Sequence, residues 1–217
     1  MPKPTTIAEL RSLVAAWTPV PLARSGDGIA TGVPAVDAAL GGGLPRGRVT
    51  ELVSAAPGSG GGLVFAALLA STRAARLRVA LIDAADGFAP RSHRADQLSH
   101  LVWVRARSLP EALACADVLV RDGNYAVLVL DVRGIPLRIL RQQPAGAWHR
   151  LRLAAEQNAG AVLVQSEAGF VPAVPWRLAL RTPTGLGGLR RTHAERIAAL
   201  TVEMERGHAA AREKLAG

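Results

Sequence analysis

A glycine-rich segment, A-A-P-G-S-G-G-G at residues 55–62, lies between an apolar strand-like run and a helix-forming run. In the working phosphate-binding form of such a loop, G-x-x-x-x-G-K-[ST], the lysine reaches the β- and γ-phosphates and the hydroxyl holds Mg²⁺. Here Ala55 stands at the first glycine of that pattern and Gly60 keeps the second. Gly61 and Gly62 replace the lysine and the hydroxyl residue. The chain therefore keeps the strand–loop–helix frame of a phosphate loop and lacks its two chemical side chains.

Apolar runs and helix-forming runs alternate along the rest of the chain. Strands are expected at residues 49–53, 79–83, 101–104, 125–131, 161–165 and 176–182, and helices at 62–76, 108–121 and 148–157. Unbroken apolar strands such as Y-A-V-L-V-L-D at 125–131 are typical of parallel sheets that are covered on both faces. The pattern therefore predicts an α/β fold with a mostly parallel central sheet and helices on both faces.

An amphipathic segment precedes this core at residues 5–17. Its apolar side chains fall on one helical face and are Ile7, Leu10, Val14 and Trp17. A segment with two prolines at 18–27 follows it and is expected to be an extended linker. Because a helix this short is marginal alone, we expect it to dock on its own core or on a partner.

A second amphipathic segment follows the core. Thr192 and Glu195 have the capping-box spacing, which predicts the start of a C-terminal helix. The apolar stripe of that helix is Ile197, Leu200 and Met204. It is expected either to bind a partner or to cover a core face or the sheet edge. The chain is thus divided into an N-terminal helix and linker at 1–24, a core at 25–184 and a C-terminal helical tail at 185–217.

Composition limits the classes of function. The formal net charge of +9 comes almost wholly from arginine and attracts polyanions or acidic protein faces, although an arginine-rich genome gives the same composition. Cys115 is the one cysteine, which excludes an intramolecular disulfide and a cysteine-based zinc cage, and the five histidines lack ligand spacing. No signal-type segment follows Lys3 and no run approaches the ~20 apolar residues of a membrane span. We therefore expect no metal, no membrane contact and a cytoplasmic location.

Several segments resemble the ATPase core of RecA recombinases. The segment I-A-T-G-V-P-A-V-D-A-A-L-G-G-G-L-P-R-G-R-V-T-E-L at 29–52 is similar to the opening pattern of that family. L-I-D-A-A-D-G-F-A-P at 81–90 resembles the strand that ends in Asp-Ala-Glu, and V-L-V-L-D at 127–131 resembles the Walker B strand. The resemblance covers roughly residues 25–182 and implies a RecA-like core.

The departures from the family fall on its catalytic residues. The Glu of Asp-Ala-Glu is the family's general base, and Ala85 occupies that place. Asp131, at the Walker B position, is kept, while the Gln that senses the γ-phosphate aligns best with Ser166, one residue after Gln165. The resemblance therefore implies no ATPase activity, no catalytic residue and no cofactor. For the loop at 55–62, a tight turn that binds nothing and retained nucleotide binding are the two interpretations.

The two DNA-binding loops of the family are short in this chain. The first follows Asp131 and carries Arg133, Arg138 and Arg141, which are candidate contacts to DNA phosphates. The second, at 166–175, has no basic residue. The alternative for Arg138 and Arg141 is that they are solvated above apolar residues.

A shortened RecA-like chain with degenerate ATPase motifs resembles the ImuA-type proteins, which are encoded with error-prone polymerase components. The resemblance implies a non-catalytic role in the bacterial DNA-damage (SOS) response and translesion DNA synthesis, within the mutasome. It implies as partners RecA, an ImuB-like adaptor and an error-prone polymerase, with the N-terminal helix assigned to RecA and the C-terminal helix to the polymerase side. The alternatives are a DNA-binding protein that uses the arginine-rich loop and an ATP-binding RecA-like switch related to the KaiC and RadA groups.

Overall fold

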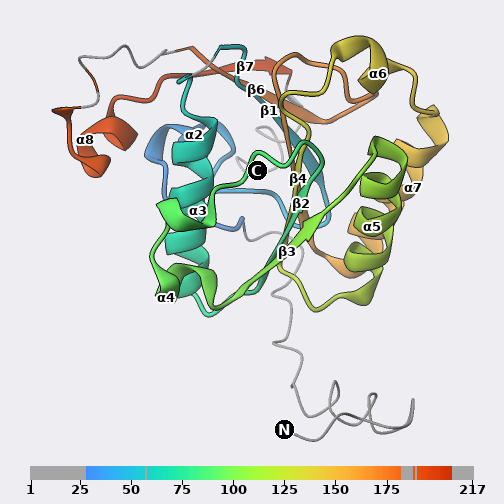
Figure 1. Cartoon of the computed structure of the whole chain (residues 1–217), viewed down its shortest axis with the longest axis horizontal. Helices are drawn as coiled ribbons and strands as arrows, with labels where there is room; N and C mark the ends of the chain where they lie inside the picture. Colours follow the sequence, from blue (N-terminus) through green and yellow to red (C-terminus); the bar gives the residue numbers. More distant parts are fainter. Residues whose placement is uncertain (1–27, 57, 182–187, 189, 207–217) are drawn as a thin grey trace, which may run out of the picture.

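A seven-stranded sheet forms the centre of the molecule (Figure 1). The computed structural model describes residues 28–56, 58–181, 188 and 190–206. The strand order is β3-β2-β4-β5-β1-β6-β7, in which all neighbours are parallel except β6 and β7. The predicted α/β class with a mostly parallel sheet is confirmed. The N-terminal segment with Ile7, Leu10, Val14 and Trp17 lies outside the described residues.

Every strand predicted for the core is present, with ends that differ by at most two residues. The strands are β1 (Val49–Val53), β2 (Val79–Asp83), β3 (Leu101–Arg105), β4 (Val127–Asp131), β5 (Ala161–Ser166), β6 (Trp176–Leu180) and β7 (Val202–Arg206). The helices are α2 (Pro34–Ala39), α3 (Gly61–Ala74), η1 (Pro90–Ser92), α4 (Ala95–Leu98), α5 (Leu109–Asp122), α6 (Leu137–Arg141), α7 (Ala145–Asn158) and α8 (His193–Ala198). Within the described residues, no helix combines the length and apolar composition that crossing a bilayer requires.

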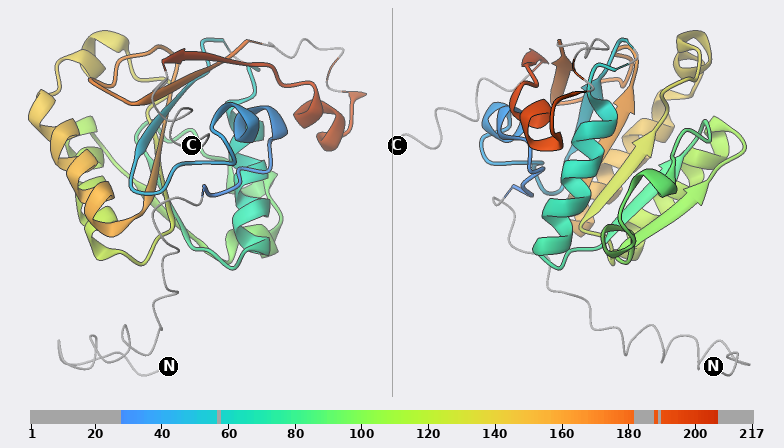
Figure 2. Two further views of the ribbon diagram at one scale, coloured as in Figure 1. Left: turned by 180° about the vertical axis from the view of Figure 1, so that it is seen from behind. Right: turned by 60° about the vertical axis from the view of Figure 1, so that its left-hand side comes forward.

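Helices cover both faces of the sheet because its central strands are apolar on both faces. In β4, Val127 and Val129 join the core cluster beneath α2 and α3, whereas Leu128 and Leu130 join the cluster beneath α5 and α7. Figure 2 shows the two helical layers on opposite sides of the strands. This two-sided burial explains why the strands read as continuous apolar runs.

The start of α7 differs from its prediction. The helix was expected to begin at Trp148, but it begins three residues earlier, at Ala145. Trp148 is therefore inside the helix, where it is buried and packs edge-to-face against Phe170, with 5.2 Å between ring centroids. Its role is structural, and it also closes one side of a small cavity described below.

The prediction of a continuous C-terminal helix was wrong. The capping box at Thr192 and Glu195 is present and begins α8, but this helix ends at Ala198. The chain then forms β7, which pairs with β6 at the edge of the sheet. Leu200 lies between the two elements and is buried, and Met204 lies in the strand. The alternating sequence V-E-M-E-R at 202–206 has the period of a strand, and edge pairing prevails over helix periodicity here.

Candidate functional site

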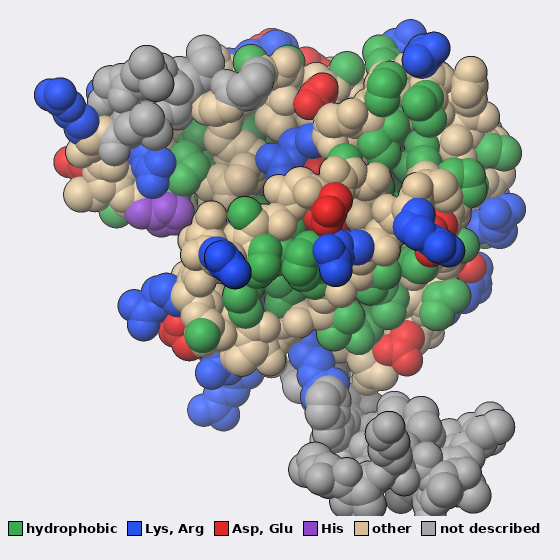
Figure 3. Space-filling model, in the orientation of Figure 1, with side chains coloured by type: hydrophobic (Ala, Val, Ile, Leu, Met, Phe, Trp, Pro, Cys, Tyr) green, Lys and Arg blue, Asp and Glu red, His purple; other side chains and the backbone are tan. Residues whose placement is uncertain are grey.

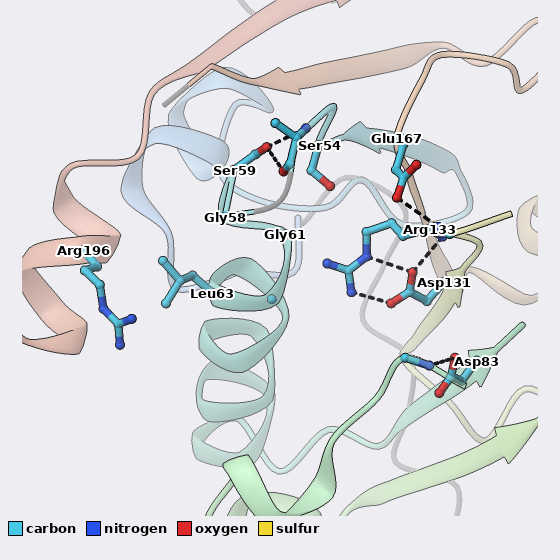
Figure 4. Close-up of a pocket in the computed structure, with 15 residues that line it drawn as sticks. Ser54, Gly58, Ser59, Gly61, Leu63, Asp83, Asp131, Arg133, Glu167 and Arg196 are labelled. Carbon is cyan, nitrogen blue, oxygen red and sulfur yellow. Dashed lines mark hydrogen bonds and ion pairs between the residues drawn. The ribbon is translucent and has the colours of Figure 1, made fainter. Parts of the chain in front are cut away.

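An open cavity of about 570 Å³ lies at the carboxyl ends of the central strands (Figure 4). The carboxyl ends of parallel strands share one edge of a sheet, which is where open α/β folds bind ligands. The sheet therefore brings Ser54, Asp83, Asp131 and Glu167 to one place from four different strands. The glycine-rich loop at 58–62 forms another wall of the cavity. The degenerate phosphate loop and the Walker B Asp131 thus lie where the sequence predicted.

Within the glycine-rich loop, hydrogen bonds join Ser59 to Ala56. The Ser59 hydroxyl accepts a hydrogen bond from the Ala56 amide at 2.9 Å and donates one to the Ala56 carbonyl. Ser59 is buried, and Gly60 takes a positive φ of 104° as it leads into α3. A side chain of the loop therefore satisfies polar groups of the loop itself.

Arg133 reaches back from the end of β4 and pairs with Asp131. Its Nε lies 2.9 Å from Asp131 Oδ1 and its Nη2 lies 2.5 Å from Asp131 Oδ2. Burial alone would lower the pKa of the Arg133 guanidinium, but the hydrogen bond and charge of Asp131 raise it above the usual value. The pair is therefore a bidentate contact between a guanidinium and a carboxylate, which is a strong type of hydrogen-bonded pair.

The same guanidinium lies against Gly61, the position of the missing lysine. A Cβ atom at Gly61 would lie 2.7 Å from Arg133 Nη1 and 2.9 Å from Ser54 Oγ. Figure 4 shows the Arg133 side chain between the loop at Gly61 and the carboxylate of Asp131. A positive charge thus occupies this part of the cavity, supplied by β4 rather than by the loop. Arg133 was a candidate DNA contact, and that remains a prediction, but in this structure its side chain is bonded to Asp131 and turned into the cavity.

Gln165 and Ser166 face opposite sides of the sheet. Gln165 is buried, and its amide Nε2 donates to the Gly61 carbonyl at 3.3 Å. Ser166 donates to Glu51 on the other face. The expected alignment of the family's sensing Gln with Ser166 is therefore wrong in this fold, since Gln165 is the residue that contacts the loop.

Asp83 lines the next part of the cavity, and Ala85 follows it in the turn after β2. The Asp83 carboxylate accepts hydrogen bonds from the backbone amides of Ala85, Gly87 and Phe88 at 3.4, 3.0 and 2.9 Å. Asp83 is therefore occupied in holding the turn after β2. Ala85, at the place of the family's general base, offers no side chain that can activate water.

The charges that line the cavity do not favour the binding of a polyanion. Three carboxylates line it, from Asp83, Asp131 and Glu167, and they outnumber the guanidiniums of Arg133 and Arg196. Phosphate groups need an excess of positive charge or of free amide donors. The surplus of carboxylates, together with the bonds between Ser59 and Ala56, therefore favours the interpretation of the loop as a tight turn.

Leu200 packs against the glycine-rich loop at Gly60. A Cβ atom at Gly60 would overlap Leu200, whose side chain is buried in the core. Ile197 packs at the edge of the same cluster, and Met204 is about one-third exposed. Of the three candidate partner contacts in the C-terminal segment, Leu200 thus serves the core, which is the second of the two roles expected for the stripe.

Arg138 and Arg141 lie on α6, apart from the cavity, and both are exposed. No ion pair joins either of them to a carboxylate in the part of the chain that the structure describes. These two arginines, unlike Arg133, are available to a solvent-side partner.

Comparison with known proteins shows similarity to RecA. The chain is 37% identical over 120 residues to Protein RecA of Chlorobium chlorochromatii, covering 50% of this chain and 33% of that protein. It is 38% identical over 109 residues to Protein RecA of Clostridium acetobutylicum, covering 48% and 31%. It is 36% identical over 107 residues to Protein RecA of Deinococcus radiodurans, covering 48% and 29%.

These similarities support a relationship to the RecA-like superfamily, in agreement with the α/β core. The matched part corresponds to about a third of the length of these relatives. No protein-family model matches the chain.

Proposed function

We propose that this chain is a non-catalytic RecA-like accessory factor of the ImuA type, acting in the DNA-damage response and translesion synthesis of a bacterium by binding RecA and polymerase components. The observation that carries the non-catalytic part is the Arg133–Asp131 pair beside Gly61. An internal guanidinium stands where hydrolysis requires a loop lysine and a metal-bound phosphate. The partner assignment, including the ImuB-like adaptor, rests on the resemblance of the shortened RecA-like chain. The cytoplasmic location is part of the proposal and rests on the sequence expectation alone.

An ATPase assay tests the non-catalytic part. We expect the purified chain to give no phosphate release above a buffer blank, because lysine, metal hydroxyl and general base are all replaced. Each such group commonly contributes about 2–4 kcal/mol to transition-state stabilisation. The control is the Asp131→Ala variant, which should give the same blank. Turnover in the native chain that disappears in this variant would overturn the proposal.

A pulldown with RecA tests the partner part. We expect the full chain to retain purified RecA, and a variant that lacks residues 1–24 to retain less of it while its core stays folded. Equal retention by the two proteins would remove the N-terminal segment from the interface. No retention by either would remove RecA as a direct partner. The same assay with polymerase components tests the other assignment.

DNA binding is the second candidate function, and α6 favours it. Arg138 and Arg141 are exposed and lack carboxylate partners among the described residues. A salt titration of single-stranded DNA binding measures this directly, because each phosphate contact steepens the dependence of log affinity on log salt by roughly 0.7. A slope that is lower by about 1 to 2 in an Arg138→Gln/Arg141→Gln variant supports this function.

A further inference from the structure

A small apolar cavity of about 190 Å³ lies on the α7 face of the sheet, away from the glycine-rich loop. Its floor is Val49 in β1, and one wall is α7 with the buried Trp148. The other wall is the segment 171–175, which follows β5 and contains Pro172 and Pro175. In the left view of Figure 2, α7 and the connection after β5 lie on the same side of the sheet. Small-molecule sites usually have volumes of roughly 300–1,000 Å³, so this cavity has the size for one side chain.

The wall at 171–175 is held in place by a buried carboxylate. Glu51 is fully buried in β1 and accepts hydrogen bonds from the Phe170 amide at 2.9 Å and the Val171 amide at 3.3 Å. Arg177 Nε lies 2.6 Å from the same carboxylate, and its Nη2 donates to the Val171 carbonyl at 3.0 Å. The cavity is therefore formed before any partner arrives, which reduces the entropy lost on binding.

The rim of the cavity is electropositive. Arg152 lines it, and its Nη2 lies 2.9 Å from Nδ1 of His149, which lines it as well. None of the residues that line the cavity is acidic, and the nearby Glu156 on α7 is paired with Arg48. The first turn of α7, at Ala145, adds the positive end of a helix that has no side-chain cap. On the right-hand side of Figure 3, over α5 to α7, apolar side chains are exposed among arginines and carboxylates.

We propose that this cavity binds an acidic segment of a partner protein, with one large apolar side chain of that segment seated between the exposed Ala145 and Pro172 and its carboxylates facing Arg152. The charge of the rim selects an acidic partner, and the apolar walls select the anchor. A nucleic acid fits less well, because sequence-tolerant binding of bases needs an exposed aromatic face. Trp148 is only 4% exposed and its ring is covered by Phe170.

Fluorescence anisotropy with a labelled peptide tests the proposal. The probe is D-D-E-L-F-D-D, compared with D-D-E-S-S-D-D, which lacks the anchor, and with a labelled dT12 oligonucleotide. We expect the first peptide to bind with micromolar affinity and the second at least tenfold more weakly. Equal affinity of the two peptides, or no binding of the first up to 1 mM, would overturn the proposal. Binding of dT12 alone, when lost in Arg152→Glu, would assign the rim to nucleic acid instead.

Three variants locate the site. Arg152→Glu should weaken the peptide at least tenfold, and Ala145→Trp, which places a large ring at the exposed mouth, should remove the difference between the two peptides. The matched control is Arg91→Glu, which changes the charge by the same amount at an exposed residue on η1. This control should alter the affinity less than twofold. An equal effect of Arg152→Glu and Arg91→Glu would show that the peptide responds to the net charge of the protein and would refute the site.

The cavity shares no residue with the glycine-rich loop. These results are therefore independent of the ATPase and RecA assays.

Discussion

At the scale of single residues, Arg133 gives the clearest physical account of a missing motif. A lysine at 61 and an arginine at 133 would place two cations against one carboxylate, Asp131. The chain has one cation there, supplied by β4, and Gly61 provides the space for it. Loss of the loop lysine and the position of Arg133 are therefore one arrangement and not two separate changes.

Two neighbouring glycines provide a direct test of this arrangement. Gly61→Ala should lower the free energy of unfolding by about 1–3 kcal/mol, because its Cβ displaces Arg133 or Ser54. Gly62→Ala should raise it by about 0.5–1 kcal/mol, since nothing lies within 4 Å of a Cβ there and alanine favours α3. Urea denaturation of both variants measures the difference. If the cost at 61 arises from Arg133, it should shrink in a background that carries Arg133→Ala. An unchanged cost would point to Ser54 instead.

Two half-buried histidines make the stability depend on pH. Burial lowers the pKa of His93, and nearby His193 lowers it further, while burial and then Arg73 lower the pKa of His100. Each contribution is complete above the ordinary value of 6.5 and is lost as the pH falls through the lower folded-state pKa, because the unfolded chain binds the proton first. The free energy of unfolding should therefore be smaller at pH 5.5 than at pH 7.5. A His93→Gln/His100→Gln variant should show a weaker dependence, and an equally steep one would contradict this origin.

At the scale of elements, the C-terminal segment shows where sequence patterns fail. Ile197, Leu200 and Met204 are spaced as on a helix, yet the chain leaves the helix at Ala198 and enters β7. The local sequence carries both signals, because V-E-M-E-R at 202–206 alternates as a strand does. What decides between them is the open edge of β6, which exists only in the folded sheet. The parallel strands, in contrast, could be predicted from sequence, since burial on both faces leaves an unmistakable apolar run.

Leu200 and Met204 should respond differently to truncation. Leu200→Ala should lower the free energy of unfolding by about 2–5 kcal/mol, because it leaves a cavity beside Gly60 in the core. Met204→Ala should change it by less than about 1 kcal/mol, since Met204 is 37% exposed in an edge strand. Thermal or urea unfolding of the two variants makes the comparison. Similar small effects would return Leu200 to the list of candidate partner contacts.

The candidate site shows the same division between what the sequence reveals and what it hides. The loop at 55–62 and Asp131 were located from motifs, because their positions relative to strands are fixed by the chain itself. The ion pair between Arg133 and Asp131 was not, since only folding shows that the side chain turns back toward Gly61. The one available signal was an arginine two residues after the strand-end aspartate, next to a loop that lacks its own cation.

At the scale of the whole molecule, β7 is the edge strand of the sheet and covers the edge of β6. It runs antiparallel to β6, and Arg181 next to β6 pairs with Glu203 and Glu205 at 2.6 and 3.0 Å. Exposed ion pairs of this kind contribute at most about 1 kcal/mol each, so the backbone pairing is the larger effect. The strand removes an apolar edge that would otherwise be open to other chains.

Two truncations measure that effect. A chain that ends at 206 keeps β7, and a chain that ends at 201 lacks it. We expect the first to remain monodisperse in size-exclusion chromatography and the second to aggregate or to elute as larger species, because β6 becomes an edge with apolar neighbours. If both behave alike, protection of the sheet edge does not depend on β7.

The internal pairing of Arg133 with Asp131 also bears on how such a protein is turned on and off. A nucleotide switch changes state because its ligand leaves and is replaced, so its population follows the ratio of ATP to ADP in the cell. A guanidinium that is tethered two residues from its carboxylate cannot diffuse away or be exchanged. Under the proposed function, we therefore expect the charge beside Gly61 to stay in place whatever the ratio of ATP to ADP. We expect control of the protein to act on the amount of the chain instead.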